Sequence, residues 1–89
     1  MEKNNSICII IVNYQSDNYA LELIKSINSQ NFTEYIKIIV VDNTERKSSS
    51  QFFNKIKNKN IISVKAPENL GYFGGARLGL KKLKELNGK

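Results

Sequence analysis

Three short runs of apolar, mostly β-branched residues stand out along the chain, at residues 7–12, 36–41 and 61–64. Runs that are apolar at both odd and even positions are typical of strands covered on both faces, as in the parallel sheets of α/β proteins. The third run is shorter and weaker than the other two. The pattern therefore predicts three strands buried in one parallel sheet.

A helix is predicted between the first two strands. Ala20, Leu23, Ile24 and Ile27 follow one another at the i, i+3, i+4, i+7 spacing of an amphipathic helix. A Ser and an Asp at residues 16–17 are candidates to cap its start. The first two strands and this helix thus form a βαβ unit.

Two further helices are predicted after the second and third strands. The serines at 48–50 can cap a short helix whose apolar residues lie within 52–56. A third helical face consists of Ala76, Leu80 and Leu83 and ends near Gly88. The order βαβαβα predicts an α/β fold of three layers, with a mostly parallel sheet and right-handed crossovers.

Polar residues follow the first two strands at the point where each strand ends. In open parallel sheets, ligands bind at the carboxyl ends of the strands. Asn13 and Tyr14 follow the first strand, and Asp42 and Asn43 follow the second. A carboxylate here can accept a hydrogen bond from a nucleobase N–H or a ribose hydroxyl, although an Asx-type turn explains Asp42 taken by itself. Tyr14 can equally pack in the core or meet a base.

The third strand leads into a turn at residues 67–71 and then into a glycine-rich segment. Asn69 and Gly71 suit a positive φ, and Gly74 and Gly75 allow the backbone to approach another group closely. A dinucleotide fingerprint is excluded because it would place glycines directly after the first strand, and no P-loop pattern is present. Composition by itself thus indicates close packing at the start of a helix.

Bulk composition is that of one folded domain. The chain has 89 residues, of which 40% are hydrophobic and 25% charged, so we expect a single domain over residues 1–89. The longest apolar run falls far short of the roughly 20 residues that span a membrane, and we expect no signal peptide before it. Cys8 is the one cysteine and lies within that run, so we expect a buried, inert thiol. These features favour a cytoplasmic protein.

The formal net charge of +6 comes mainly from twelve lysines. Many of them lie among helix-like segments, at 55, 57 and 59 and again at 81, 82 and 84, where lysine normally covers a solvated face. Arginine, the usual reader of bases, occurs only twice. We therefore expect no nucleic-acid partner, while a phosphate-bearing substrate or the inner face of a membrane remains compatible with the charge.

Three motifs in this order resemble a known family. They are IVNYQS at residues 11–16, VVDNT at 40–44 and PENLGYFGGARLG at 67–79. Their order and spacing are similar to the N-terminal region of family 2 glycosyltransferases, especially the rhamnosyltransferase-like branch. The resemblance extends from Ile7 to about Leu86. Each motif is weak singly, but the three together on three predicted strand ends are fairly specific.

The resemblance implies the Rossmann-like half of a GT-A fold that binds a UDP- or dTDP-linked sugar. Asp42 is then expected to contact the uracil or thymine base or its ribose. The other expected nucleotide-binding residues are Asn13, Tyr14 and Asn43 beside it, Asn69, Gly71 and Gly75 on the pocket floor, and Arg77. Where the family usually has Asn, this chain has Arg77, which either reaches a phosphate or faces solvent.

The same resemblance points to chemistry that these residues do not supply. Family members hold Mg²⁺ or Mn²⁺ through an Asp-x-Asp motif after a fourth strand, and inverting members use an acidic general base. Asp17 and Asp42 are the only aspartates here, so no Asp-x-Asp exists and we expect neither catalytic nor metal-binding residues in this chain. We expect a truncated part of a sugar transferase, inactive by itself, whose parent uses the metal.

Two functions other than that of a sugar-transferase fragment remain open, and the absence of a fourth strand has one structural consequence. The chain could instead be a non-catalytic α/β nucleotide-binding or interaction module, or, less favoured, a basic nucleic-acid-binding protein. The fold implied by the resemblance has the sheet order third, second, first and then fourth strand. Without a fourth strand, residues 7–12 form an apolar edge, for which we expect self-association. For the parent we expect peripheral contact with a membrane.

Overall fold

The computed structural model describes residues 7–30 and 35–87. Strands and helices alternate along the chain, and the predicted βαβαβα order is confirmed. Helix α3 extends to the last described residue, so the end expected near Gly88 lies outside the described part. The elements are β1 (Ile7–Asn13), α1 (Asp17–Asn28), β2 (Ile36–Asp42), α2 (Ser50–Lys55), β3 (Ile61–Lys65) and α3 (Gly71–Asn87).

The three strands form one parallel sheet in the order β1-β2-β3. The central strand β2 is the most deeply buried, and residues 38–41 within it have no exposed surface. Its last residue, Asp42, is paired with Asn13 on one side and with Lys65 on the other. The carboxyl ends of all three strands therefore meet at one edge of the sheet.

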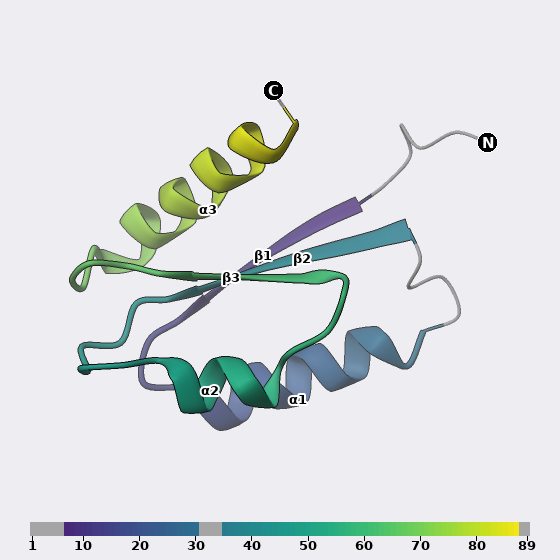
Figure 1. The fold of residues 1–89 in the computed structure, drawn as a ribbon, viewed down its shortest axis with the longest axis horizontal. Helices are drawn as coiled ribbons and strands as arrows, with labels where there is room; N and C mark the ends of the chain where they lie inside the picture. The colour runs from purple at the N-terminus through teal and green to yellow at the C-terminus, as the bar shows by residue number, and fades with distance from the viewer. Residues whose placement is uncertain (1–6, 31–34, 88–89) are drawn as a thin grey trace.

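Helices cover both faces of the sheet, as the apolar runs predict (Figure 1). Side chains alternate along β2, so Ile38 and Val40 face α1 and α2, while Ile39 and Val41 face α3. Buried residues of the first face come from β1, β2, α1 and α2: Ile11, Ala20, Ile24, Ile36, Ile38, Val40, Phe52 and Ile56. The predicted three-layer α/β architecture is confirmed.

Glycines set the position of α3 on the sheet. A Cβ added to Gly75 would lie 2.7 Å from Cγ1 of Val12, and one added to Gly79 would lie 2.7 Å from Cγ2 of Ile10. Both distances are shorter than a van der Waals contact, so the helix backbone lies against β1 where side chains would otherwise separate them. The close approach expected at Gly75 is therefore present.

Two helix faces differ from the sequence prediction. Leu80 is 50% exposed, because the contact through Gly79 turns the face with Leu78 and Leu83 toward the sheet. In α1, Leu23 is 47% exposed, whereas Leu21 packs on the core. The buried residues of α1, Ala20 and Ile24, belong to the core cluster on the sheet. Leu23 and Leu80 were therefore wrongly predicted as core residues.

Strand β1 has one neighbour, β2, among the described strands. Ile7 at its start is 53% exposed. Cys8 is half-buried rather than fully buried, and its partial burial raises the pKa of the thiol. Pairing of this outer edge with a second copy of the chain stays a prediction. No helix within the described residues is long and apolar enough to cross a membrane.

Candidate functional site at the carboxyl ends of the strands

Asn13 connects the end of β1 to the start of α1 and to β2. Its side chain is buried, with 1% exposed. The amide Nδ2 donates to Asp17 Oδ1 at 2.7 Å and to Asp42 Oδ1 at 3.2 Å, and Oδ1 accepts from the backbone N–H of Ser16 at 3.0 Å. Both amide hydrogens and the oxygen are thus used within the chain. Asn13 acts as the local turn former that starts α1 beside Asp42.

Asp42 has no exposed side-chain surface. Oδ1 accepts from Asn13 and from the backbone N–H of Thr44 at 3.3 Å. Oδ2 accepts from Arg46 Nε at 2.9 Å and from the hydroxyl of Ser49. A carboxylate buried in this way is stable only when it is paired and hydrogen-bonded, and these four groups meet that requirement.

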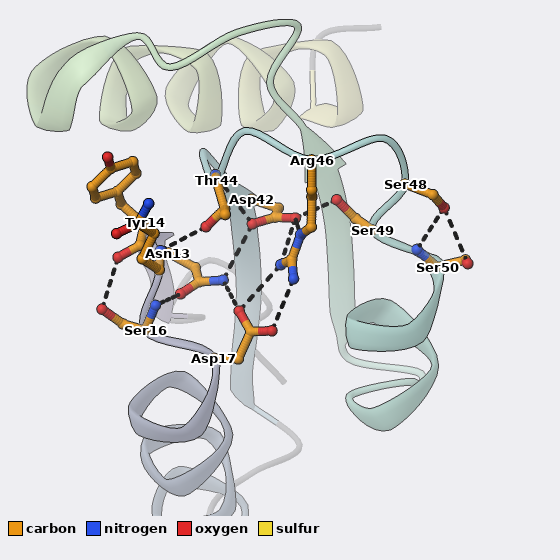
Figure 2. Close-up of polar contacts among 11 residues, drawn as sticks. Asn13, Tyr14, Ser16, Asp17, Asp42, Thr44, Arg46, Ser48, Ser49 and Ser50 are labelled. Carbon is orange, nitrogen blue, oxygen red and sulfur yellow. Dashed lines mark hydrogen bonds and ion pairs between the residues drawn. The ribbon is translucent and has the colours of Figure 1, made fainter.

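Arg46 bridges Asp42 to Asp17 (Figure 2). Nη2 lies 2.8 Å from Oδ2 of Asp42 and 3.1 Å from Oδ1 of Asp17, and Nη1 lies 2.9 Å from Oδ2 of Asp17. The guanidinium carbon also lies 5.4 Å from the ring centroid of Phe52, within the range of a cation–π contact. The loop after β2 is therefore folded back onto the start of α1.

Arg46 shifts the titration of its exposed partner. Its hydrogen bond is the main cause that holds the pKa of Asp17 below the ordinary value, against a smaller opposing effect of burial. Conversely, the hydrogen bond to Asp17 is the main cause that raises the pKa of Arg46. The two groups therefore remain a charged pair at neutral pH.

Separating Arg46 from Asp42 would cost folding free energy. Breaking a buried ion pair by taking away one partner costs roughly 3–5 kcal/mol, because the remaining charge is left unpaired. A hydrogen bond from a base N–H to the charged carboxylate returns only about 1.5–3 kcal/mol net, which is less than that loss. A nucleobase is therefore unable to displace Arg46 by its own hydrogen bond, so any direct contact between Asp42 and a base needs a further source of free energy.

An open pocket of about 350 Å³ lies beside the Asp17–Arg46 pair. Its lining consists of residues 15–19 together with Thr44 and Arg46. Gln15 has a φ of 52°, and its backbone N–H donates to the Thr44 hydroxyl at 2.6 Å, which joins the two loops across the pocket. The volume is at the lower end of the roughly 300–1,000 Å³ found for ligand pockets.

The eight residues predicted from the sequence as a site do not line this pocket. Tyr14 is the nearest along the chain, and 44% of it is exposed, so it is not a core residue. The remaining seven fall into separate groups because Asp42 and Asn43 are consecutive at a strand end and point to opposite faces of the sheet. Asp42 belongs to the side of α1 and α2, and Asn43 belongs to the side of α3.

Asn43 stabilises the turn between β3 and α3 through two side-chain hydrogen bonds. It is 2% exposed, its Nδ2 donates to the carbonyl of Gly71 at 2.9 Å, and its Oδ1 accepts from the N–H of Leu70 at 3.0 Å. Asn69 Oδ1 accepts from the N–H of Gly71, whose φ is +75°. Gly75 lies next to Asn43, since a Cβ there would be 3.2 Å from Nδ2. The structure thus brings Asn43, Asn69, Gly71 and Gly75 together.

Arg77 is exposed on α3, two residues after Gly75. Within residues 7–30 and 35–87, no ion pair to Arg77 is found. The same residues contain no group of three His, Cys, Asp or Glu side chains that could hold a metal ion. The contact of Arg77 with a phosphate and the use of Mg²⁺ or Mn²⁺ by a parent protein stay predictions.

Arg46, Asp17 and Ser49 are polar partners that the sequence pattern does not single out for this edge. The spacing of Arg46 is one available signal, because it is the first cation after a carboxylate predicted at the end of a buried strand. Asp17 has no such signal, since its contact with Arg46 joins residues 29 positions apart. Its predicted role was that of a helix cap, but the N-cap position is Ser16, no side chain makes a capping hydrogen bond, and Asp17 is the first residue of α1.

The whole chain was compared with known proteins. Searches of the curated proteins and of the solved structures found no significant match. The family described as "Glycosyl transferase family 2" matches residues 8–85. This range includes β1 from its second residue onward, β2, β3, the loop with Arg46 and the turn held by Asn43. Because the match covers most of the 89 residues, the chain belongs to glycosyl transferase family 2.

Proposed function

We propose that the chain binds a pyrimidine nucleoside diphosphate sugar, linked to UDP or dTDP, at the carboxyl ends of β1 and β2. The observation that carries this proposal is the convergence of Asn13, Asp17, Asp42 and Arg46 at that edge, next to an open pocket, in a family 2 glycosyltransferase chain. Ligand binding at this edge is the general behaviour of open parallel sheets.

This proposal assigns a role to each group of predicted residues. The exposed ring of Tyr14 is available to stack on the base, and the group fastened by Asn43 forms the floor toward the sugar and phosphates. Arg77 is exposed and able to meet a phosphate. The formal charge of +6 favours the approach of a diphosphate. A rhamnosyl donor is the finer proposal, supported by the motif at residues 67–79.

Sugar transfer itself needs groups beyond those of the site. Both aspartates of the chain are ion-paired with Arg46, so neither is an unpaired carboxylate for a metal or for deprotonating an acceptor hydroxyl. We therefore propose that the 89 residues bind the nucleotide sugar without transferring it. In a larger parent protein, transfer would go to a glycan or lipid-linked acceptor with Mg²⁺ or Mn²⁺.

Titration calorimetry of the chain with UDP, dTDP and ADP tests the proposal. We expect heats of binding for the two pyrimidine nucleotides and weaker or no binding of ADP. Equal affinity for all three would instead support a general nucleotide-binding module. Absence of binding at millimolar UDP and dTDP would refute the proposed site.

A further inference from the structure

The polar groups that a ligand can reach at this edge are not those of Asp42. Its two oxygens accept four hydrogen bonds from the chain, and none of its side-chain surface is exposed. The side chains of Asp17 and Arg46 are 38% and 26% exposed, respectively, and both line the open pocket. A ligand in the pocket therefore meets the outer side of this pair.

The free donor and acceptor positions of the pair can be counted. A guanidinium has five N–H groups. In Arg46, Nε and Nη2 are directed to Asp42 and Asp17, and Nη1 donates once to Asp17, which leaves one N–H on Nη1. Oδ1 of Asp17 already accepts from Asn13 and Arg46, but Oδ2 accepts from Arg46 only within the described residues and keeps acceptor capacity. The pocket thus offers one donor next to one acceptor.

Uracil and thymine present the complementary pattern. Their imide has an N–H donor at N3 flanked by two carbonyl acceptors, so N3–H can donate to Asp17 while a neighbouring carbonyl accepts from Nη1 of Arg46. Tyr19, which is 78% exposed and lines the same pocket, offers a second ring for the face of the base in addition to that of Tyr14. The pocket volume of about 350 Å³ is sufficient for a pyrimidine with part of its ribose.

We propose that the exposed Asp17–Arg46 pair reads the imide edge of the pyrimidine base, and that the buried Asp42 is a positioning residue which holds Arg46 in place for that contact. The inference rests on the proposed function, because it names the groups that recognise the nucleotide at the same site. In this inference Asp42 acts on the base through Arg46 and does not contact the base directly.

The test compares UDP with UDP methylated at N3, in which a methyl group replaces the N3–H donor and the rest of the ligand is unchanged. Both are titrated into the isotope-labelled chain and followed by NMR. The wild-type chain is expected to bind UDP roughly tenfold more tightly than the methylated analogue, the effect of one lost hydrogen bond. Asp17→Ala should bring the two affinities within about twofold of each other. Glu22→Ala removes an exposed acid from the same helix and should keep the wild-type ratio.

Arg46→Lys provides the second arm. It keeps a cation for Asp42 but loses the planar fork, so we expect UDP to bind roughly tenfold more weakly. Tighter binding of UDP would show that Arg46 blocks a contact with Asp42, and it would overturn the inference. Retention of the wild-type preference by Asp17→Ala would also overturn it. If the wild-type chain binds neither UDP nor dTDP, the proposed function fails as well, so the two failures are distinguishable.

Discussion

Arg46 lies four residues after Asp42, and its Nη2 approaches to 2.8 Å from Oδ2 of a carboxylate that has no exposed surface. Three other groups also donate to Asp42, but Arg46 supplies the only positive charge among them. The stability of this edge of the sheet therefore depends on a single cation in the loop between β2 and α2.

Replacing that cation should destabilise the fold strongly. We expect Arg46→Gln to lower the free energy of unfolding by about 3 kcal/mol, since Asp42 is left buried without a counter-charge. Urea denaturation followed by circular dichroism measures the change. The double variant with Asp42→Asn should recover part of the loss because the unpaired charge is removed. Lys47→Gln, at an exposed neighbouring position, is the control. Equal effects of the Arg46 and Lys47 variants would contradict the assigned role.

Asp17 should make stability depend on pH in one direction. Its pKa in the folded chain is below the ordinary value of 3.8, so its contribution is present above that value and is lost as the pH falls through the lower, folded pKa. Because 38% of the side chain is exposed, we expect Asp17→Asn to cost less than about 1 kcal/mol at pH 7. Urea denaturation at pH 7, 5 and 3 should show this difference shrinking below about pH 4. A difference that stays constant or grows would contradict the ion pair.

Gly79 should tolerate no side chain where α3 crosses the sheet. A Cβ there would lie 2.7 Å from Ile10 and 3.3 Å from Val41, both on β-branched side chains. We expect Gly79→Ala to destabilise by about 1–3 kcal/mol, despite the better helix propensity of alanine. Leu80→Ala, at the adjacent exposed position, should cost well under about 1 kcal/mol. Thermal unfolding compares the two variants, and a larger loss for Leu80→Ala would show that α3 is rotated from the described position.

Asn43 should control the order of the turn before α3. Its side chain accepts from the N–H of Leu70 and donates to the carbonyl of Gly71, so Asn43→Ala removes both contacts at once. We expect a loss of about 2 kcal/mol and faster hydrogen exchange at the Leu70 amide, because a buried polar group then has no partner. The hydrogen-exchange rates of amides in α1, on the other face of the sheet, should change only as far as the global stability changes. Unchanged protection of Leu70 would mean that another group holds the turn.

Much of the fold follows from local pattern, whereas the site depends on contacts between distant residues. The strands were predictable from their apolar, β-branched runs, although only β2 is buried almost throughout, because β1 and β3 each pair with β2 alone among the described strands. The exposure of Leu23 and Leu80 was not predictable, since the rotation of α1 depends on which of its side chains pack on the core and that of α3 depends on the glycine contacts with β1. The polar edge was predictable from Asn13 and Asp42, but the bridge to Asp17 joins residues that only the folded loop brings together. A buried carboxylate demands a cation, and Arg46 is the first cation after Asp42 along the chain.

The most direct test of nucleotide binding at this edge is a titration of UDP into the isotope-labelled chain, with each backbone amide followed by NMR. The proposal predicts saturable shifts concentrated in residues 13–19 and 42–46. A second pocket, lined by Lys25, Lys57 and Asn58 at the amino end of the sheet, serves as the internal reference and should be unaffected. No shift at millimolar UDP, or shifts confined to that second pocket, would contradict the account.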